Sequence, residues 1–440
     1  MKFHAEKALR GTVKIPGDKS ISHRSVLLGA IANGDTTAHG FLRSADCLAT
    51  IDCFRALGIS IEERTEIAAD GSEDNVVIIH GKGLRGLSEP SKVLDAMNSG
   101  TTVRLISGIL SGQNFDSTIT GDASLRKRPM RRIMEPLEMM GIMTESVENN
   151  DCIPLIIHGG NPRAIRYTSK VASAQVKSCV LLAGLYAEDP TFLTEPALSR
   201  NHTELMLSAF GGNVKSKVNK ETGEATAIVY PGTILEGQEI TIPGDISSAA
   251  YFLAAGLLVP GSEILLQNVG INDTRDGILR VIRAMGGSIK LNHVRMEGGE
   301  PVADILVSAS ELHGTKIGGS LIPTLIDEIP VIAVMAACAD GDTEITDASE
   351  LRVKESDRLA AIAEGLTAMG ISVEERKDGL LIHGGTLHGA SIRSLGDHRL
   401  AMAFAIAGIV AEGETEIDDI ECVNISYPEF FADLENLRSI

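Results

Sequence analysis

The segment DKSISHR at residues 18–24 brings an ammonium group, hydroxyl groups and a guanidinium group together within two helical turns. A Pro-Gly turn precedes it, and its first residue, Asp18, is a typical helix N-cap. Cations are unfavourable in the first turns of a helix, because that end of the helix is itself positive. Lys19 and Arg24 therefore indicate a bound anion, which the free backbone N–H groups of the first turn would also attract.

Other expected helix starts carry similar groups. Arg104 follows NSGT at 98–101, where Gly100 would let a ligand approach the backbone closely. Ser173 and Gln175 open a further apolar helix with a hydroxyl and an amide. A solvated helix face is the alternative for any one of these clusters, but their recurrence at helix starts favours an anion site.

Carboxylates open two more apolar helices. Asp327 precedes the run IPVIAVMAA, and Asp397 precedes His398-Arg399 and a second apolar run. N-capping explains either aspartate taken alone. It does not explain Arg399, and carboxyl groups among cations also suit proton transfer on an anionic substrate.

Two further segments are strongly charged. LRKRPM at 125–130 places three cations before a proline, which is a signal for a helix start. In LRVKESDR at 351–358, Lys354 and Arg358 are four residues apart and are expected on one helix face. A surface ladder of salt bridges is one interpretation; the other is that both hold a phosphate while Glu355 moves a proton.

The chain of 440 residues has a formal net charge of −19. This balance argues against general nucleic-acid binding, although a small anionic substrate needs only local positive charge. No GxxxxGK[ST] loop, credible GxGxxG unit or GxSxG elbow occurs in the sequence. We therefore expect proton transfer and electrostatic stabilisation on a multiply anionic substrate, with no metal and no organic cofactor.

Cysteine usage and the N-terminus indicate the compartment. Six cysteines occur without a CxxC pair, so we expect no disulfide framework, no zinc site and a reducing environment. The N-terminus lacks the apolar region of a signal peptide, and no stretch is long enough to span a membrane. A cytoplasmic protein without a membrane partner is expected.

The phrase Ile-Pro-Gly-Asp occurs at 15–18 and again at 242–245, each time before a helix of small apolar residues. It divides the chain into two related halves, and each half divides into three units of roughly 70 to 80 residues. Each unit is expected to add a β-like run, and five then add an amphipathic helix that stops at a glycine. The last unit is expected to end in a helix at roughly 427–439. The small-residue helices are expected to begin near Lys19, Asn98, Ser173, Ser247, Asp327 and Asp397.

Helices and strands alternate without a strict βα order, which predicts an α/β (α+β) fold with mixed sheets. Three units per half imply two similar domains, with residues 1–18 and 243–440 in domain one and 19–242 in domain two. If the buried helices of each domain run parallel, their positive ends meet at one surface. We expect the active site in the cleft between the domains.

The chain resembles the 5-enolpyruvylshikimate-3-phosphate synthases along its whole length. The wording of ASAQVKS and LRVKESDRL is similar to the bacterial class II branch of that family. The matching segments, in family order, are PGDKSISHR (16–24), NSGTTVRL (98–105), LRKRPM (125–130), ASAQVKS (172–178), SRNHTE (199–204), PGDISSAAYFLAA (243–255), DEIP (327–330), LRVKESDRL (351–359) and GDHRLAMAFA (396–405).

The resemblance implies the enolpyruvyl transferase fold, in which two domains, each of three βαβαββ units, close over the substrates. It implies transfer of the enolpyruvyl group of phosphoenolpyruvate to the 5-hydroxyl of shikimate 3-phosphate, with release of phosphate, in the shikimate pathway to chorismate and the aromatic amino acids. We expect a monomer whose partners are these two small molecules, and no cofactor.

The resemblance also implies roles for individual residues. Asp327 would be the base for the 5-hydroxyl, and Lys19 and Glu355 would share protonation of the methylene carbon and departure of phosphate. The residues implied for shikimate 3-phosphate are Lys19, Ser20, Arg24, Ser173, Ala174, Gln175, Arg200, Asp327 and Lys354. Those implied for phosphoenolpyruvate are Lys19, Gly100, Arg128, Gln175, Arg358 and Arg399.

The sequence departs from the family pattern at several places. Many members carry a lysine just before the C-terminal [ST]-[FY]-P, and residues 423–428, VNISYP, lack it. Ala174 stands where the other branch has a serine, so only a backbone contact is expected there. Gly100 leaves room for the inhibitor glyphosate, where tolerant class II members often have alanine.

The sequence argues against three other functions. The sister family transfers enolpyruvyl to UDP-N-acetylglucosamine with a mobile-loop cysteine, but residues 120–129 contain no cysteine. A non-catalytic phosphate-ester binding protein would not need Lys19, Asp327 and Glu355 together. A structural repeat scaffold would not need cations at its helix starts.

Overall fold

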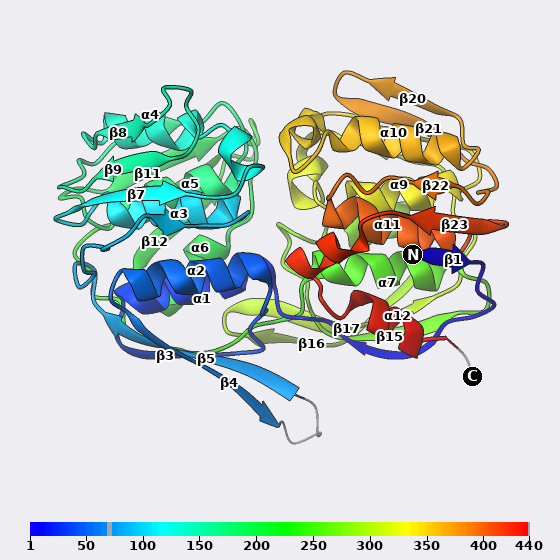
Figure 1. The fold of residues 1–440 in the computed structure, drawn as a ribbon, viewed down its shortest axis with the longest axis horizontal. Helices are drawn as coiled ribbons and strands as arrows, with labels where there is room; N and C mark the ends of the chain where they lie inside the picture. The colour runs from blue at the N-terminus through cyan, green and yellow to red at the C-terminus, as the bar shows by residue number, and fades with distance from the viewer. Residues whose placement is uncertain (68–72, 439–440) are drawn as a thin grey trace. The chain divides into compact units, whose positions relative to one another are not determined.

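The computed structural model describes residues 1–67 and 73–438, which belong to two compact units (Figure 1). Unit 1 consists of residues 1–16, 243–296 and 301–440. Unit 2 consists of residues 17–242 and 297–300. The chain passes from one unit to the other within each Ile-Pro-Gly-Asp phrase.

Unit 2 repeats a pair of helices beside a mixed sheet. The helix pairs are α1 (Lys19–Ile31) with α2 (Ala45–Ala56), α3 (Gly100–Leu110) with α4 (Arg131–Met139), and α5 (Ala174–Gly184) with α6 (His202–Ala209). The sheets have the strand orders β14-β3-β5-β4, β6-β7-β9-β8 and β10-β11-β13-β12. In each sheet the first pair is parallel and the others are antiparallel. The strands are β3 (Asn33–His39), β4 (Ser60–Ile67), β5 (Glu73–Lys82), β6 (Leu94–Asp95), β7 (Asp116–Thr120), β8 (Thr144–Ser146), β9 (Leu155–His158), β10 (Arg166–Thr168), β11 (Thr191–Glu195), β12 (Asn213–Val218), β13 (Ala225–Tyr230) and β14 (Glu239–Thr241).

Unit 1 repeats the same plan. Its helix pairs are α7 (Ile246–Leu258) with α8 (Gly277–Ala284), α9 (Ile329–Ala337) with α10 (Arg358–Ala368), and α11 (His398–Gly408) with α12 (Phe430–Asn436). The sheets have the orders β16-β17-β15-β2, β18-β19-β21-β20 and β1-β23-β22. The strands are β1 (Lys2–His4), β2 (Arg10–Lys14), β15 (Glu263–Gly270), β16 (Ser288–Glu297), β17 (Glu300–Ser308), β18 (Lys316–Ile317), β19 (Asp342–Ile345), β20 (Val373–Arg376), β21 (Gly379–His383), β22 (Ser391–Ile392) and β23 (Glu414–Ile417).

Most of the predicted helix boundaries are confirmed, but the last helix begins at Phe430, later than the predicted 427. The six small-residue helices begin within two residues of the expected positions. The amphipathic helices stop where a glycine adopts a positive φ, which side chains other than glycine rarely tolerate. The last helix, α12, ends at Asn436, and the predicted end at residue 439 lies outside the described residues. The stop glycines are Gly58, Gly141, Gly211, Gly286 and Gly370.

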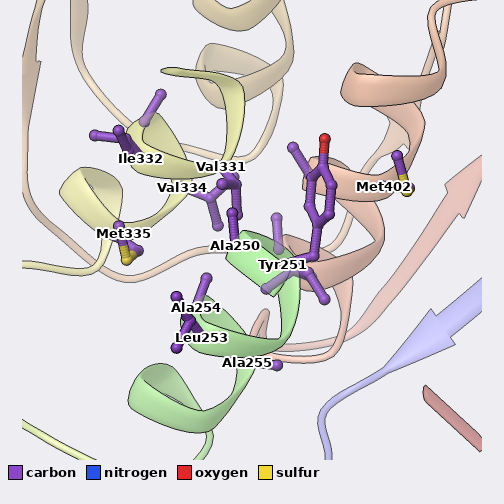
Figure 2. Packing of buried hydrophobic residues seen from close by; sticks show 14 of the residues in the cluster. Ala250, Tyr251, Leu253, Ala254, Ala255, Val331, Ile332, Val334, Met335 and Met402 are labelled. Atoms are coloured by element: carbon purple, nitrogen blue, oxygen red, sulfur yellow. The ribbon is translucent and has the colours of Figure 1, made fainter. Parts of the chain in front are cut away.

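The first helix of each pair is buried almost all round, as its small apolar residues predict. In unit 2 a Cβ at Gly108 would lie 2.3 Å from the carbonyl oxygen of Cys179, so α3 and α5 can approach this closely only with glycine there. In unit 1, Figure 2 shows small side chains of α7, such as Ala250, beside aliphatic side chains of α9, such as Val331. The packing of these helices therefore fixes the positions of the residues at their N-termini.

A histidine–aspartate pair recurs at the same place in three sheets. Nδ1 of the histidine lies 2.8 Å from an aspartate oxygen in the His80–Asp35 and His383–Asp342 pairs, and 2.9 Å in the His158–Asp116 pair. The two residues are directly opposite each other on antiparallel strands in every case. The pair is a second mark of the internal repeat.

Candidate active site

The start of α1 carries the first group of predicted site residues. Asp18 caps the helix by accepting the N–H of Ile21 at 2.9 Å, as predicted. Nζ of Lys19 lies 2.6 Å from Oδ2 of Asp46, at the start of α2. Asp46 was not predicted as a site residue, and it holds the ammonium of Lys19 beside the positive end of α1.

Arg24 is buried one turn further along α1. Its guanidinium donates to Oγ1 of Thr203 at 2.7 Å, to Oγ of Ser178 at 2.9 Å and to the carbonyl of Ser20 at 2.9 Å. Burial lowers the pKa of Arg24 to about 10; the carboxylate of Glu204 opposes this shift, and the cation of Arg200 adds to it. The charges of Arg24 and Arg200 thus act on each other, and the carboxylates of Glu204 and Asp18 act on Arg24 more strongly than Arg200 does.

The start of α5 provides the second group. Ser173 is the N-cap, with its side chain accepting from the N–H of Val176, and Ala174 is the first residue of the helix. Gln175 accepts from Nη1 of Arg104 at 2.9 Å and donates to Oγ1 of Thr101 at 3.1 Å. The amide is therefore oriented by the start of α3.

The start of α3 provides the third group. A Cβ at Gly100 would lie 2.7 Å from Nη1 of Arg104 and 3.4 Å from Nη1 of Arg128, so the glycine brings two guanidinium groups next to the backbone. Nη2 of Arg128 donates to Oδ1 of Asn98 at 2.9 Å. The sequence indicates Arg104 as a cation at a helix start, but it contains no signal that Arg104 orients Gln175.

In unit 1, three cations surround one carboxylate, that of Asp327. Oδ1 of Asp327 lies 3.7 Å from Nζ of Lys354 and 3.6 Å from Nη1 of Arg358, and its Oδ2 lies 4.0 Å from Nη2 of Arg399. Asp327 precedes Glu328, which holds the N-cap position of α9. The N-cap interpretation of Asp327 is therefore wrong.

For Asp397, by contrast, capping is confirmed, and the residue has a second role. Its Oδ1 accepts the N–H of Arg399 at 3.0 Å. It also pairs with Arg358, whose Nε and Nη2 lie 2.8 and 3.1 Å from the two oxygens. Nη2 of Arg358 further contacts Oε2 of Glu355 at 2.7 Å.

The segment 351–358 is not one helix, and the expectation that Lys354 and Arg358 share a helix face is wrong. A 3-10 turn, η3 (Ser349–Val353), ends before Lys354, and α10 begins at Arg358. Asp357 caps α10 by accepting the N–H of Ala360 at 3.2 Å. The two cations nevertheless meet at Asp327, because the chain turns between them.

The predicted residues are thus gathered within each unit. Unit 1 brings Asp327, Lys354, Glu355, Arg358 and Arg399 together, and unit 2 places its predicted residues at the starts of α1, α3 and α5 and in the loops near them. Among residues 1–67 and 73–438, no group of three or more His, Cys, Asp or Glu side chains is placed to hold a metal ion. None of the helices in the same ranges is long and apolar enough to cross a membrane.

The chain matches known enolpyruvyl transferases over nearly its whole length. The family described as EPSP synthase (3-phosphoshikimate 1-carboxyvinyltransferase) matches residues 3–434. The chain is 52% identical over 425 residues to the 3-phosphoshikimate 1-carboxyvinyltransferase of Desulforamulus reducens, covering 96% of each chain. It is 51% identical over 431 residues to that of Brevibacillus brevis, covering 98% of each.

Solved structures agree with this match. The EPSP synthase of Acinetobacter baumannii superposes with a TM-score of 0.85 at 43% identity, over 99% of this chain and 97% of that one. The enolpyruvyl transferase NikO of Streptomyces tendae superposes with a TM-score of 0.75 at 17% identity, over 99% and 96% of the two chains, and shares the fold. The predicted mixed α/β fold is confirmed as the enolpyruvyl transferase fold.

Proposed function

The chain belongs to the EPSP synthase family, and on that premise we propose which of its residues bind the two substrates and which transfer protons. The chain catalyses the family reaction, in which the enolpyruvyl group of phosphoenolpyruvate moves to shikimate 3-phosphate and phosphate is released. The reaction is part of the shikimate pathway of aromatic amino acid biosynthesis.

Asp327 is the base that takes the proton of the 5-hydroxyl. The observation that carries this assignment is the ring of three cations, Lys354, Arg358 and Arg399, within 4.0 Å of its carboxylate. The cations keep this carboxylate ionised, so it is free to accept the hydroxyl proton once the anionic groups of the substrates have bound to the cations. Because Asp327 is not the N-cap of α9, capping is no competing reason for its presence.

Glu355 and Lys19 handle the second proton. Bond formation between the 5-oxygen and phosphoenolpyruvate requires a proton at the methylene carbon, and loss of phosphate requires that a proton leaves the resulting methyl group. Glu355 is held by Arg358, and Lys19 is held by Asp46, so each group has a fixed neighbour. A positive charge near the leaving phosphate favours its departure, which suits Lys19.

The remaining site residues bind the substrates. For shikimate 3-phosphate we propose Lys19, Ser20, Arg24, Ser173, Ala174, Gln175, Arg200, Asp327 and Lys354. For phosphoenolpyruvate we propose Lys19, Gly100, Arg128, Gln175, Arg358 and Arg399.

Two further proposals concern the state of the protein. It acts as a monomer, as expected from the sequence. It works in a reducing compartment, the cytoplasm, where its cysteines, which are free thiols in the described residues, persist unpaired.

Phosphate release tests the proposed site. Wild type with both substrates should release phosphate and form 5-enolpyruvylshikimate 3-phosphate, and omission of either substrate should abolish both signals. Replacing shikimate 3-phosphate by UDP-N-acetylglucosamine should give no product. Asp327→Asn should bind both substrates and release phosphate far more slowly; a variant with the wild-type rate would contradict the assignment of the base.

A further inference from the structure

A cluster of buried charges lies in unit 2 behind the residues proposed to contact the substrates. Nζ of Lys177 lies 2.9 Å from Oε1 of Glu195 and 2.9 Å from Oε1 of Glu204. The side chains of Lys177 and Glu195 are each only 1% exposed, and that of Glu204 is 6% exposed. No step of the proposed reaction uses these groups, so their burial needs another explanation.

The cluster forms hydrogen bonds with both main-chain groups of Ser199, the carbonyl and the N–H. Nζ of Lys177 donates to the carbonyl oxygen of Ser199 at 3.1 Å. Oε1 of Glu195 accepts the N–H of Ser199 at 2.9 Å, and the Ser199 hydroxyl contacts both carboxylate oxygens, Oε2 at 2.7 Å. The peptide groups on either side of Ser199 are therefore fixed, and the next residue is Arg200, a proposed ligand of shikimate 3-phosphate.

Lys177 connects the cluster to α5. Lys177 lies on this buried helix, whose first turn carries Ser173, Ala174 and Gln175, also proposed ligands of shikimate 3-phosphate. Through Lys177 and Glu195, the loop with Arg200 is tied to α5, which begins at Ala174. Glu204, on α6, joins the same ammonium and couples α6 to α5.

Each carboxylate of the cluster faces a cation. Lys177 contacts both Glu195 and Glu204, and the Glu204 carboxylate also acts on Arg24. Such pairing matters because an unpaired buried charge is strongly unfavourable. Ionised groups give shorter and more directional hydrogen bonds than neutral ones, which suits a cluster that sets the position of a backbone segment.

We propose that Lys177 is a positioning residue for shikimate 3-phosphate binding: its ammonium, with Glu195, holds Ser199 so that Arg200 is placed beside the start of α5. The inference rests on the proposed role of Arg200 and adds a residue that does not contact the substrate. It predicts an effect on the KM for shikimate 3-phosphate, with the KM for phosphoenolpyruvate and kcat at saturation little changed.

The test uses the double variant Lys177→Met/Glu204→Gln, which removes one cation and one anion and so leaves the net charge unchanged; Glu195 loses its ammonium partner but keeps its hydrogen bonds to Ser199. We expect its KM for shikimate 3-phosphate to rise about tenfold, and its KM for phosphoenolpyruvate to stay within about twofold of wild type. Val180→Ala is the matched control: it lies on the same helix, is fully buried in the apolar core, and should lower stability without changing either KM. If the double variant does not fold, Lys177→Arg, which keeps the charge and moves the donors, replaces it with the same expectation.

A double-mutant cycle with Arg200→Ala separates positioning from a general loss of structure. Arg200→Ala alone should raise the KM for shikimate 3-phosphate, and adding Lys177→Met/Glu204→Gln to it should raise the KM no further, because the cluster acts through Arg200. An additive rise, or no rise in the Lys177 variant, overturns the inference and leaves the proposed site intact. If Arg200→Ala leaves that KM unchanged, the assignment of Arg200 itself is wrong, and the inference is overturned with it.

Discussion

Arg358 and Asp397 form a two-point ion pair in the interior of unit 1, although they are 39 residues apart in the sequence. Burial by itself would lower the pKa of Arg358, but the carboxylates of Asp397 and Glu355 raise it well above its ordinary value. Burial would likewise raise the pKa of Asp397, but the guanidinium of Arg358 holds it below its ordinary value. The pair fixes Arg358 so that Nη1 points at Asp327, 3.6 Å away.

We predict that Asp397→Asn weakens phosphoenolpyruvate binding and lowers stability together. Removing one partner of a buried ion pair costs about 3–5 kcal/mol, and Arg358 would no longer be held in its binding position. The KM for phosphoenolpyruvate should rise at least tenfold, and chemical denaturation should show the loss of stability. Because the pKa of Asp397 is lowered in the fold, the contribution of the pair is complete above the pKa of an unfolded aspartate, about 3.9. It is lost as the pH falls through the lower folded value, so wild type and variant should converge in acid.

Asp357→Asn is the matched control for that prediction. Asp357 caps α10 next to Arg358 and pairs with Arg352 at 2.9 Å, without contact to the proposed binding residues. Asparagine also caps helices well, so stability should change little and the KM for phosphoenolpyruvate should not change. Equal effects of both substitutions would show that the helix cap, rather than the position of Arg358, is what Asp397 provides.

Asp327→Asn should lower kcat by roughly 10² to 10⁴, the usual contribution of a general base. The binding of phosphoenolpyruvate should suffer much less, because Lys354, Arg358 and Arg399 remain and lose a competing negative charge. Steady-state kinetics with both substrates measure the first effect, and a direct titration of phosphoenolpyruvate measures the second. A large loss of stability with near-normal turnover would point instead to a structural role for the carboxylate.

Local patterns in the sequence account for the fold. Runs of small apolar residues identify buried helices, and glycines such as Gly58 and Gly370 identify helix ends, because both signals depend only on neighbouring residues. The break between η3 and α10 had such a signal too: Asp357 is an N-cap residue directly before an apolar helix. The i, i+4 spacing of Lys354 and Arg358 suits a helix as well, but here it predicts a helix that the structure does not contain.

The partners that orient the site could not be predicted in the same way. Lys19 pairs with Asp46, 27 residues away, and Gln175 is held by Arg104, 71 residues away. Such pairs depend on how separate helices pack, and hydrophobic periodicity carries no information about this. The residue types at the helix starts are therefore sufficient to indicate an anion site. The residues that orient those side chains can be identified only from the structure.

The repeated histidine–aspartate pairs lead us to expect that the free energy of unfolding depends on pH. Hydrogen bonds to Asp35 and then to Glu62 raise the pKa of His80. A raised pKa in the fold gives stability that is complete below the unfolded value of about 6.5 and is lost as the pH rises through the folded value. His80→Gln should therefore be destabilising near pH 6, by less than about 1 kcal/mol at this partly exposed site, and nearly neutral at pH 9.

Denaturation midpoints at the two pH values test this expectation. In the Asp35→Asn background the pH-dependent part of the His80→Gln effect should be smaller, since the main partner of the imidazole has lost its charge. A His80→Gln effect of the same size at pH 6 and pH 9 would show that packing, and not the charged pair, is what the histidine contributes.

Gly100→Ala should disturb the site proposed for phosphoenolpyruvate. The added Cβ would lie 2.7 Å from Nη1 of Arg104, so that guanidinium must move, and Nη1 also holds Gln175. The far end of an arginine can shift at modest cost, so the variant should fold and keep activity, with a raised KM for phosphoenolpyruvate. Glyphosate, expected to compete for the same site, should lose at least tenfold in affinity, because overpacking a tight site costs about 1–3 kcal/mol.

Competition assays on wild type, Gly100→Ala and Gly160→Ala decide the point. Gly160 is the control because a Cβ there would meet only the side chain of Ile142, at an ordinary 3.7 Å. If Gly100→Ala and wild type have the same inhibition constant, space at Gly100 does not control glyphosate binding. A wild type that is already insensitive would shift the explanation to charge, because residues 423–428 lack the lysine that many relatives carry near the C-terminus. In that case a lysine introduced by Asn424→Lys should increase sensitivity, since it would restore one positive charge for the anionic inhibitor to meet.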